Sequence, residues 1–580
     1  MGDILRIDLS TGATRTQPLP PELVRDYVGA KGIGSHLLLE EVGPEVDPLS
    51  PQNKLIFSTG PLSGSNMPGT DRYTVFFLSP QTGGYGECSS GGKLATQFAR
   101  SGHSMVILEG KAASPVFLEI SDGELSIHPA DDLWGLDTYA AEERIVERVG
   151  VKTAQACVIG PAGEKLVRFA CIQNNRTHSL GRGGAGAVMG SKNVKGLVFH
   201  GDTRPQVARP DELKALIAEM IARGKDHPST HSYHRMGTVQ MVRVTNGLSM
   251  FPARYWTKGY LDDFEPLSGE TMVEKYKIKN STCPPCFIAC GHVCRVPDGP
   301  LEGLEVDGPE FETIYAFGGL CEIVDFPNIL FYNDICDRGG IDTITAGNLC
   351  ALAIEASRRG LIDLKIDYGD AEGVARLLEL IIARQGIGDL FAQGILTVEK
   401  ELGLKGMAVH VKGMEPAGYD PRRSKGMGLG YAMSSRGACH MRATFMKAEL
   451  SGLIDINTTE GKGNMYVDWE NRFTIMDCMV FCRFYRDLLD WEFLARIANA
   501  AIGTDYTVEE FGAVANRIVT DTHDFNRRRG FGAEQEKLPA WITEHSITAV
   551  VGEELTVTSE QMEHMRRDYY EARGWGSPPA

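Results

Sequence analysis

Four of the thirteen cysteines crowd into one short segment, which is a common sign of a bound metal. Cys283, Cys286 and Cys290 form the pattern C-x2-C-x3-C, and Cys294 follows four residues later. Three thiolates at this spacing can hold one face of an iron–sulfur cluster, with a fourth ligand from elsewhere. Zinc is the alternative, but a zinc site usually adds a second close pair, and Cys478-x3-Cys482 is less usual for that role. The spacing favours an iron–sulfur cluster over zinc and indicates that Cys294 is a bystander.

Glycine-rich segments suggest loops that could hold an anion. The most unusual is GRGGAGAVMGSK at 181–192, and others lie at 83–93 and 425–430. Such glycine density lets a backbone turn tightly and direct successive N–H groups at a phosphate. Arg182 and Lys192 would add positive charge. The spacing matches neither the dinucleotide-binding nor the P-loop pattern, and a tight bulge in a domain core is the alternative for the first segment. Several such loops suit a large ligand with more than one phosphate.

Two kinds of pattern divide the elements that must position these residues. Residues 1–205 are rich in short β-type runs, among them KLIFSTG, YTVFFLS and KGLVFHG. From 206 to 410 apolar residues recur at helical spacing, and residues 411–580 begin glycine-rich and continue helical. We therefore predict an α+β fold with a β-rich N-terminal domain and two mostly helical domains, the first of which carries the C-x2-C-x3-C motif.

Composition narrows the functional classes. The chain has 580 residues, of which 42% are hydrophobic, so a large core needs no disulfide bonds. The odd number of cysteines also argues against a disulfide framework. A net charge of −17 argues against nucleic acid as a partner. The sequence has no apolar run long enough to span a membrane and its start does not look like a secretory signal, so we expect a cytoplasmic protein.

Taken in order, these motifs resemble the aldehyde:ferredoxin oxidoreductase family over essentially the whole chain. The matching segments are Thr70-Asp71-Arg72 with the Ser89–Gly92 turn, GRGGAGAVMGSKNVKG at 181–196, C-x2-C-x3-C at 283–290, GPEFET at 308–313, Asp337–Asp342, DPRRSKGMGLGYAMSSRGACHMRA at 420–443 and Asp477–Cys482. Agreement of this many ordered motifs is not expected by chance.

The resemblance implies an enzyme that oxidises aldehydes to carboxylic acids. Its cofactor would be tungsten or molybdenum held by two pterins, with room for Mg²⁺ between the pterin phosphates. One 4Fe–4S cluster would lie near one pterin and pass electrons singly to ferredoxin or to an iron–sulfur partner subunit. Cys482 would be the fourth cluster ligand, beside Cys283, Cys286 and Cys290. The implied fold has two packed sheets in the N-terminal domain, and homo- or hetero-oligomers are compatible with it.

The resemblance also assigns roles to individual residues. Glu312 and His440 would be the acid/base pair, with Glu310 as a substitute for Glu312. Without the resemblance, Glu312 could equally be a solvated carboxylate and His440 a histidine that only packs in the core. The residues implied to contact the pterins are Arg72, Ser89, Gly91, Arg182, Gly183, Gly184, Asp337, Ile341, Asp342, Arg442, Asp477 and Phe481.

Departures from the family pattern leave alternatives open. Val480 stands where the pterin motif has glycine, which puts the backbone approach there in doubt. Some relatives hold iron at a dimer interface through Glu-x-x-His, and this sequence has no Glu-x-x-His. Cys321 could be a metal ligand of the kind expected in aryl-CoA reductases on the same fold. A cluster-bearing electron-transfer or scaffold protein is the non-enzyme alternative, and the number of anion loops argues against it.

Overall fold

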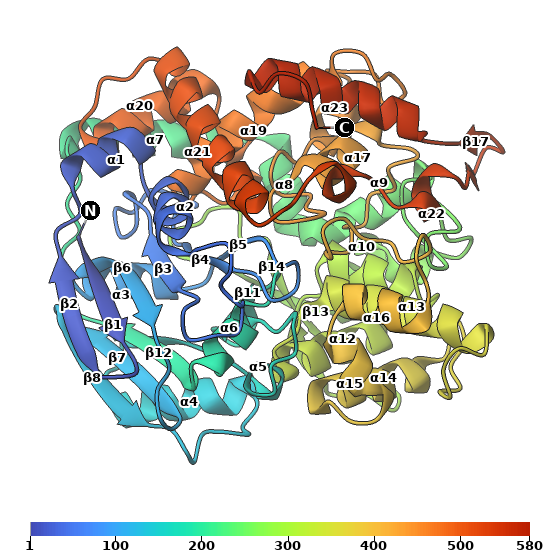
Figure 1. Cartoon of the computed structure of the whole chain (residues 1–580), viewed down its shortest axis with the longest axis horizontal. Coiled ribbons are helices and arrows are strands. Elements are labelled where there is room, and N and C mark those ends of the chain that lie inside the picture. The colour runs from blue at the N-terminus through green and yellow to red at the C-terminus, as the bar shows by residue number, and fades with distance from the viewer. Residues whose placement is uncertain (1, 580) are drawn as a thin grey trace.

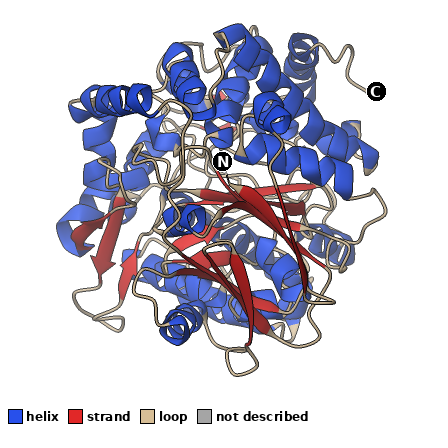
Figure 2. Cartoon of the chain, turned by 90° about the vertical axis from the view of Figure 1, so that its left-hand side faces the viewer, coloured by secondary structure: helices blue, strands red, loops and turns tan. Residues whose placement is uncertain are grey.

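The structure, a computed structural model, describes residues 2–579. Two six-stranded sheets are stacked in its N-terminal part, as Figure 2 shows. The first sheet has the strand order β2 (Ala13–Gln17), β1 (Asp3–Asp8), β6 (His103–Glu109), β3 (Leu55–Thr59), β4 (Tyr73–Leu78), β5 (Tyr85–Ser90). The second has the order β11 (His178–Leu180), β10 (Ile172–Asn174), β9 (Gln155–Val158), β12 (Val194–His200), β7 (Val116–Ser121), β8 (Glu124–Pro129).

Alternation of side chains along the strands creates the layers. On β4, Tyr73, Val75 and Phe77 face the second sheet and belong to the core between the sheets. Phe76 and Leu78 point the other way, into a core closed by helix α2 (Ala30–Glu41). Successive side chains of a strand point to opposite faces. Because β4 has a core on each side, all of its residues are buried. The predicted two packed sheets are confirmed, with helices added on their outer faces.

The middle of the chain is helical and surrounds the largest apolar core. Its main helices are α7 (Pro210–Lys225), α12 (Phe326–Gly339), α13 (Thr343–Arg358) and α14 (Ala371–Ala383). Aspartate side chains cap three of them: Asp325, Asp342 and Asp370 accept backbone N–H groups in the first turns of α12, α13 and α14. The helical spacing seen in the sequence is therefore realised, with the starts of these helices fixed by caps.

A small antiparallel sheet interrupts this helical part. It consists of β13 (Lys277–Ser281), β14 (Gly291–Arg295) and β15 (Glu305–Asp307), with β13 at the edge. The loop from β13 to β14 carries Cys283, Cys286 and Cys290. The sequence patterns did not predict these strands, because each is short and β13 alternates lysines with only one large apolar residue.

The C-terminal part returns to the N-terminal domain. Its helices include α17 (Lys425–Met433), α19 (Lys462–Cys478), α20 (Trp491–Ile502), α21 (Val508–Arg528) and α23 (Ser559–Arg573). Helix α21 packs along α2, as Figure 1 shows, and Asn526 accepts from the backbone N–H of Tyr85 at 2.8 Å. Residues from the two ends of the chain therefore meet over the first sheet. Among residues 2–579, no helix is both long and apolar enough to cross a membrane.

Candidate functional site

The four predicted cluster cysteines come together from two distant segments. Cys482 lies just after α19, where its N–H donates to the carbonyl of Gly69 at 2.8 Å. Burial raises the pKa of Cys290 well above its ordinary value, and the nearby thiols of Cys482, Cys286 and Cys283 raise it further. Tyr485, three residues after Cys482, contacts the Cys286 sulfur at 3.3 Å through its hydroxyl. The loop from β13 to β14 and the segment after α19 therefore form one thiol group.

Among residues 2–579, neither a disulfide nor a compact single-ion site is present at this thiol group. Ligand sulfurs of one zinc ion would lie about 4 Å apart. Across residues 2–579, no three His, Cys, Asp or Glu side chains gather closely enough to hold one metal ion. All thirteen cysteines are free, so no disulfide competes for these sulfurs. The four thiols are half-buried, whereas Cys294 and Cys478 are fully buried, and the bystander interpretation of Cys294 stays a prediction.

The Ser89–Gly92 turn lies directly against the cysteine loop. The N–H of Gly92 donates to the Cys283 sulfur at 3.2 Å. A side chain at Gly91 would place its Cβ 3.1 Å from that sulfur and 3.2 Å from Arg72, so this position has little room for one. Arg72 donates to the carbonyl of Ser89 at 3.1 Å. Arg72, Ser89 and Gly91, the predicted first pterin contacts, are thus grouped beside the cluster cysteines.

The loop at 181–184, the predicted anion cradle, has a backbone shape that requires glycine. Gly183 and Gly184 have φ values of 88° and 86°, which favour glycine. A Cβ on Gly184 would lie 2.1 Å from the carbonyl oxygen of Arg168. Lys192 does not contribute charge to this loop: its ammonium donates to the carbonyls of Pro51, Asn53 and Gly110 at 2.6–3.2 Å, and it is fully buried. The expectation that Lys192 assists an anion there is wrong.

Arg182 joins three separate segments below the cradle. Its guanidinium pairs with Asp342 at 2.9 Å and donates to the carbonyls of Ala438 at 3.2 Å and Glu415 at 2.8 Å. Asp342 also caps α13, so the loop, the helix and the stretch before His440 share one buried ion pair. These bonds show that Arg182 holds the loop against the start of α13 and the segments at Glu415 and Ala438. Contact between Arg182 and a phosphate stays a prediction.

Arg182→Ala is expected to destabilise the chain by about 3–5 kcal/mol, because it leaves the buried Asp342 carboxylate without its cation. We also expect loss of pterin, since the cradle is no longer fixed. Chemical unfolding of the cofactor-free chain and pterin content measure the two effects. The exposed Arg176→Ala is the control. Unchanged stability with full pterin content would show that Arg182 has neither role.

The two predicted Asp-containing motifs sit in different environments. Asp337 accepts amide hydrogens from Gln173 at 3.1 Å and Asn333 at 2.7 Å, and burial raises its pKa to about 8. Ile341, the apolar member of the same motif, pairs its backbone with Ala170. These groups have protein partners in the structure, and pterin contact by Asp337, Ile341 and Asp342 stays a prediction.

Asp477 belongs to a buried group with excess positive charge. Its carboxylate accepts from Arg483 at 2.7 Å, Arg442 at 3.2 Å and Lys31 at 3.5 Å. Arg442 and Lys31 also contact Glu87, at 2.6 and 3.1 Å. Three cations therefore share two carboxylates. The Nε of Arg442 is buried without a hydrogen-bond partner, which suits an added anion at this place.

The backbone beside this charged group keeps the shape that glycine would give it. Val480 has a φ of 57°, a value uncommon for a β-branched residue. The backbone at Val480 therefore has the conformation that glycine would favour. The valine side chain is nevertheless present there and is 2% exposed. Phe481 follows, equally buried, with its N–H donating to the carbonyl of Met476 at 2.8 Å.

Glu312 and His440 face each other across the site. Glu312 lies in the short helix α11 (Phe311–Thr313), which continues into a π-helical turn, η4 (Ile314–Gly319). Its Oε1 is 3.6 Å from Nε2 of His440, and its Oε2 accepts from the N–H of Gly418 at 2.9 Å. Glu310 is bound instead by the hydroxyl of Thr238, so the geometry supports Glu312 over its substitute.

The electrostatics of this pair suit proton transfer. Burial raises the pKa of Glu312 to about 8, so its carboxyl is protonated at neutral pH. Burial and the guanidinium of Arg182 lower the pKa of His440 well below its ordinary value, so its ring is neutral. Oε1 of Glu312 and Nδ1 of His440 are both buried without hydrogen-bond partners. Two polar atoms left open in this way are available to a substrate or cofactor.

Sequence reasoning missed two residues here. Cys439 accepts from Arg436 at 3.1 Å and from the N–H of Met441 at 3.3 Å; burial opposes its thiolate, but Arg436 and Arg442 lower its pKa to about 7. Its place beside His440, between two arginines, was a usable signal. Glu415 accepts from Thr345 at 2.8 Å and keeps Oε1 open, and burial raises its pKa to about 7. No local pattern marked Glu415.

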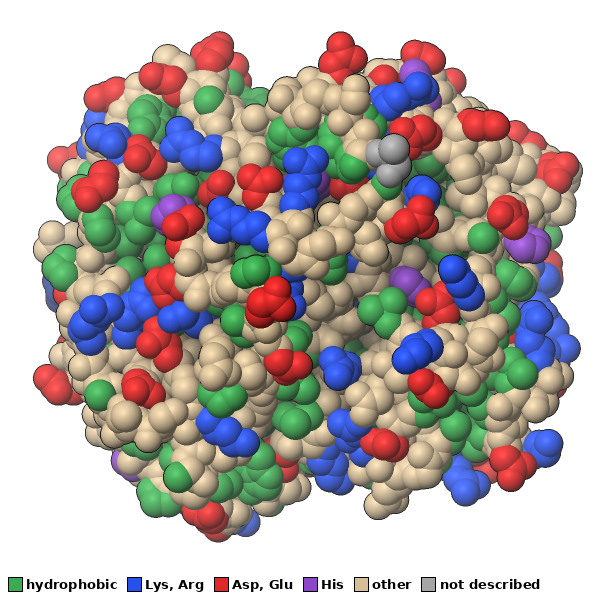
Figure 3. Space-filling model, in the orientation of Figure 1, with side chains coloured by type: hydrophobic (Ala, Val, Ile, Leu, Met, Phe, Trp, Pro, Cys, Tyr) green, Lys and Arg blue, Asp and Glu red, His purple; other side chains and the backbone are tan. Residues whose placement is uncertain are grey.

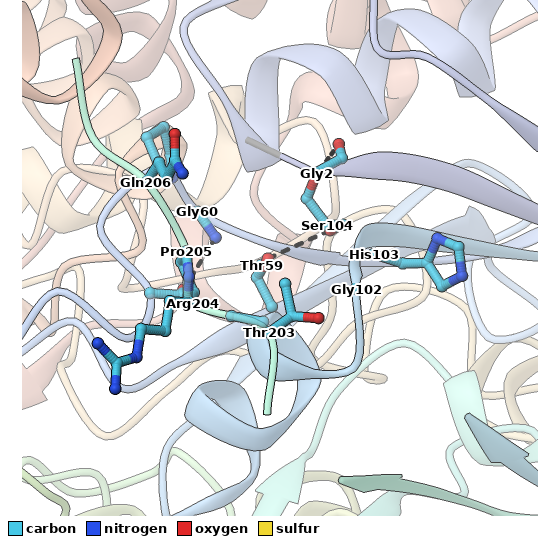
Figure 4. Close-up of a pocket in the computed structure, with 13 residues that line it drawn as sticks. Gly2, Thr59, Gly60, Gly102, His103, Ser104, Thr203, Arg204, Pro205 and Gln206 are labelled. Atoms are coloured by element: carbon cyan, nitrogen blue, oxygen red, sulfur yellow. Dashed lines mark hydrogen bonds between the residues drawn. The ribbon is translucent and has the colours of Figure 1, made fainter. Parts of the chain in front are cut away.

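Two other places do not belong to the site. Cys321 is fully buried in the largest apolar core, with its thiol toward the carbonyls of Gly347 and Ala316 at 3.5 and 3.7 Å. A surface hollow of about 240 Å³ lies where the linker at 203–206 crosses the first sheet, and Figure 4 shows it lined by His103, Ser104 and the linker residues. None of the predicted site residues lines that hollow.

Comparisons with known proteins cover nearly the whole chain. The family model for the aldehyde ferredoxin oxidoreductase N-terminal domain matches residues 4–201, and the model for domains 2 and 3 matches residues 215–578. The chain is 33% identical to a tungsten-containing aldehyde ferredoxin oxidoreductase of Pyrococcus furiosus, over 99% of this chain and 96% of the relative. The corresponding Pyrococcus horikoshii protein is 34% identical over the same shares.

A solved structure has the same fold. It is the active site complex BamBC of benzoyl coenzyme A reductase with 1,5-dienoyl-CoA, and it superimposes with a TM-score of 0.83 over 99% of this chain and 94% of that chain. Sequence identity to it is 23%, so this likeness supports the fold alone.

Proposed function

This chain belongs to the aldehyde ferredoxin oxidoreductase family and is an oxidoreductase of that type, and we propose that Glu312 and His440 move the protons of aldehyde oxidation in it. The observation that carries this assignment is the facing pair at 3.6 Å, with one open polar atom on each side chain. The pair lies next to the Arg182 anchor and the 436–442 segment, where cationic side chains gather.

The reaction converts an aldehyde and water into a carboxylic acid, two protons and two electrons. When bound, the metal of a bis-pterin cofactor supplies a Lewis acid and takes the electron pair. Glu312, protonated at neutral pH, can donate a hydrogen bond to the substrate oxygen. Neutral His440 can accept a proton from water through its open nitrogen. The N–H of Gly418 fixes the other oxygen of Glu312, so the proton-bearing oxygen faces the site.

The residues present fit the proposed cofactor. Two phosphate-bearing pterins need anion-binding positions, and the structure offers a glycine cradle at 181–184 and the cationic group around Asp477. Tungsten or molybdenum could be held in this way, with Mg²⁺ between the pterin phosphates. The four thiols would hold a 4Fe–4S cluster beside the Ser89–Gly92 turn. Electrons would then leave singly to ferredoxin or to an iron–sulfur partner subunit in the cytoplasm.

Reduction of an aryl-CoA thioester is the second candidate, and the structure gives it less support. The cysteine proposed as its metal ligand, Cys321, is fully buried in the largest apolar core and is enclosed by apolar side chains. Aldehyde oxidation needs no such ligand and uses the open Glu312–His440 pair directly. We therefore favour aldehyde oxidation.

Anaerobically purified protein is expected to contain about four irons and about one tungsten or molybdenum per chain, because four thiols would hold the cluster and the two proposed anion-binding segments the pterins. Metal analysis and pterin fluorescence after oxidation measure both groups. Screening aliphatic and aromatic aldehydes with a viologen dye then tests the reaction. Stoichiometric zinc without iron, or no activity with any aldehyde in fully loaded protein, would contradict the assignment.

A further inference from the structure

The loop that carries the cluster cysteines reaches the protein surface. Thr282, Pro284 and Pro285 are exposed, whereas Ile288, further along the same loop, is buried. The hydroxyl of Thr282 donates to the carbonyl of Cys286 at 3.2 Å, which closes this outer turn. A cluster held by these cysteines would therefore lie near solvent on the side of the two prolines.

Exposed cations flank this turn on the N-terminal-domain side. Lys93 follows Gly92, whose N–H contacts the Cys283 sulfur at 3.2 Å. The N–H of Lys93 itself donates to the side chain of Asn175 at 2.7 Å, and Arg176 comes next in the chain. Both cationic side chains are exposed. Lys93 therefore adjoins the cysteine loop through Gly92, and Arg176 adjoins Lys93 through Asn175.

Further cations lie on the helical side of the same turn. His234 contacts the carbonyl of Ile288 at 3.0 Å and precedes Arg235. Asn280 donates to the carbonyl of Ala289 at 2.8 Å and follows Lys279. Phe287 packs against Gly224 of α7, which precedes Lys225. We call Lys93, Arg176, Lys225, Arg235 and Lys279, with the apolar residues between them, the carrier surface.

Most charges of the carrier surface have no carboxylate partner within the part of the chain that the structure describes. Among residues 2–579, no carboxylate oxygen lies within 4.0 Å of the charged nitrogens of Lys93, Lys225, Arg235 or Lys279. Arg176 has one exposed partner, Glu143, at 3.7 Å. The chain as a whole carries −17, and acidic and basic side chains are interspersed over the face drawn in Figure 3. Five cations around one exposed turn thus give this part of an acidic chain a local positive charge.

An apolar centre completes the carrier surface. Ile278 is 46% exposed on the edge strand β13, between Lys277 and Lys279, and the two exposed prolines belong to the adjoining loop. Apolar contact at the centre with charges at the rim is the usual arrangement of a transient protein interface. Lysines on an edge strand also prevent sheet-to-sheet aggregation, which is the competing explanation for β13. That explanation does not account for Lys93 and Arg176, which lie on other elements.

We infer that the carrier surface docks a small acidic electron-carrier protein, which takes one electron at a time from the cluster. This inference rests on the proposed function, because aldehyde oxidation delivers two electrons and two carrier molecules remove them. Overall negative charge repels an acidic partner from most of the surface, while the local cations attract it. Long-range electrostatics would therefore orient the encounter toward the exposed turn.

The test compares two double charge reversals in the loaded enzyme. Lys225→Glu/Lys279→Glu changes the carrier surface, and Lys365→Glu/Lys405→Glu makes the same change at exposed lysines in other segments. The probe is a purified acidic ferredoxin, reduced by the enzyme with its best aldehyde. We expect the first variant to raise the KM for ferredoxin about 10-fold at low salt, with an effect that shrinks at high salt. The control variant, and viologen reduction by both, should stay within about twofold of the parent.

Further arms keep the outcomes distinct. Lys93→Glu lies away from the edge strand and should also raise the KM for ferredoxin. The inference would be overturned if the Lys225→Glu/Lys279→Glu variant aggregates while the Lys93→Glu enzyme keeps the parent's KM for ferredoxin. If the parent protein is a dimer, and Lys225→Glu/Lys279→Glu is a monomer with an unchanged KM for ferredoxin, the surface binds a second copy of this chain and the inference is wrong. Stopped-flow oxidation of pre-reduced ferredoxin by the protein needs no aldehyde, so docking can succeed where the aldehyde assay fails. Equal rates for parent and variant in that experiment would also overturn the inference.

Discussion

Replacing His440 by alanine or Glu312 by glutamine is expected to lower turnover per bound metal by about 100- to 10,000-fold, the usual range for general acid/base groups. The two side chains face each other at 3.6 Å, and neither is assigned as a ligand. Metal, iron and pterin content should therefore survive in both variants. Because groups that act as a unit are not additive, the double variant should be little slower than the slower single one.

The pH dependence separates the roles within the pair. The pKa of Glu312 is raised, so the proton-bearing carboxyl persists at neutral pH and is lost as the pH rises through about 8. We expect kcat/KM to fall over that range, and Glu312→Gln, which cannot ionise, to remove the alkaline limb. His440 has a lowered pKa and stays neutral throughout, so it adds no limb there. A Glu312→Gln enzyme with an unchanged alkaline limb would contradict this assignment.

A matched control exists elsewhere in the chain. His410 and Glu399 form another partly buried pair, at 3.4 Å, outside the site. His410→Ala should reduce stability without lowering activity per metal atom. If His440→Ala behaves in the same way, with depleted metal but normal activity per metal atom, His440 is a structural histidine and the proposed mechanism fails.

The sequence predicted those parts that follow from local pattern. Short β-type runs such as YTVFFLS became strands, and apolar residues at helical spacing marked α7 and α12–α14, because burial of one face of a helix imposes a period on the chain. Short strands such as β13 carry no such period and were missed. The ordered motifs gave the residues of the facing pair, but whether Glu310 or Glu312 meets His440 depends on how η4 follows α11.

The partners of charged side chains were harder to predict than the helices and strands that carry them. Lys192 and Arg182 stand in the same glycine-rich segment, yet Lys192 is held by three carbonyls while Arg182 reaches Asp342. The direction of a side chain depends on partners far along the chain, which a single sequence does not show. Glu415 was missed for the same reason, since its partners Thr345 and Gln81 lie 70 and 334 residues away in the sequence.

Cys482→Ser is expected to damage the cluster severely, because one of four thiolates is replaced by a much poorer iron ligand. Iron per chain and the visible absorption of the cluster should fall, and aldehyde-dependent ferredoxin reduction should be nearly abolished. The site supports this expectation, since Cys482 is one of the thiols that raise the pKa of Cys290.

Cys478→Ser, four residues earlier, is the matched control. Cys478 ends α19, is fully buried and belongs to the apolar core against which Cys286, Cys290 and Cys482 pack. Its replacement should cost some stability, because a hydroxyl is buried among apolar side chains, while iron content stays near that of the parent. The two cysteines lie four residues apart and pack against the same core, and only Cys482 is partly exposed, so the comparison separates ligation from folding. Loss of iron in Cys478→Ser with a normal cluster in Cys482→Ser would reverse the ligand assignment and, with it, the proposed position of the cluster.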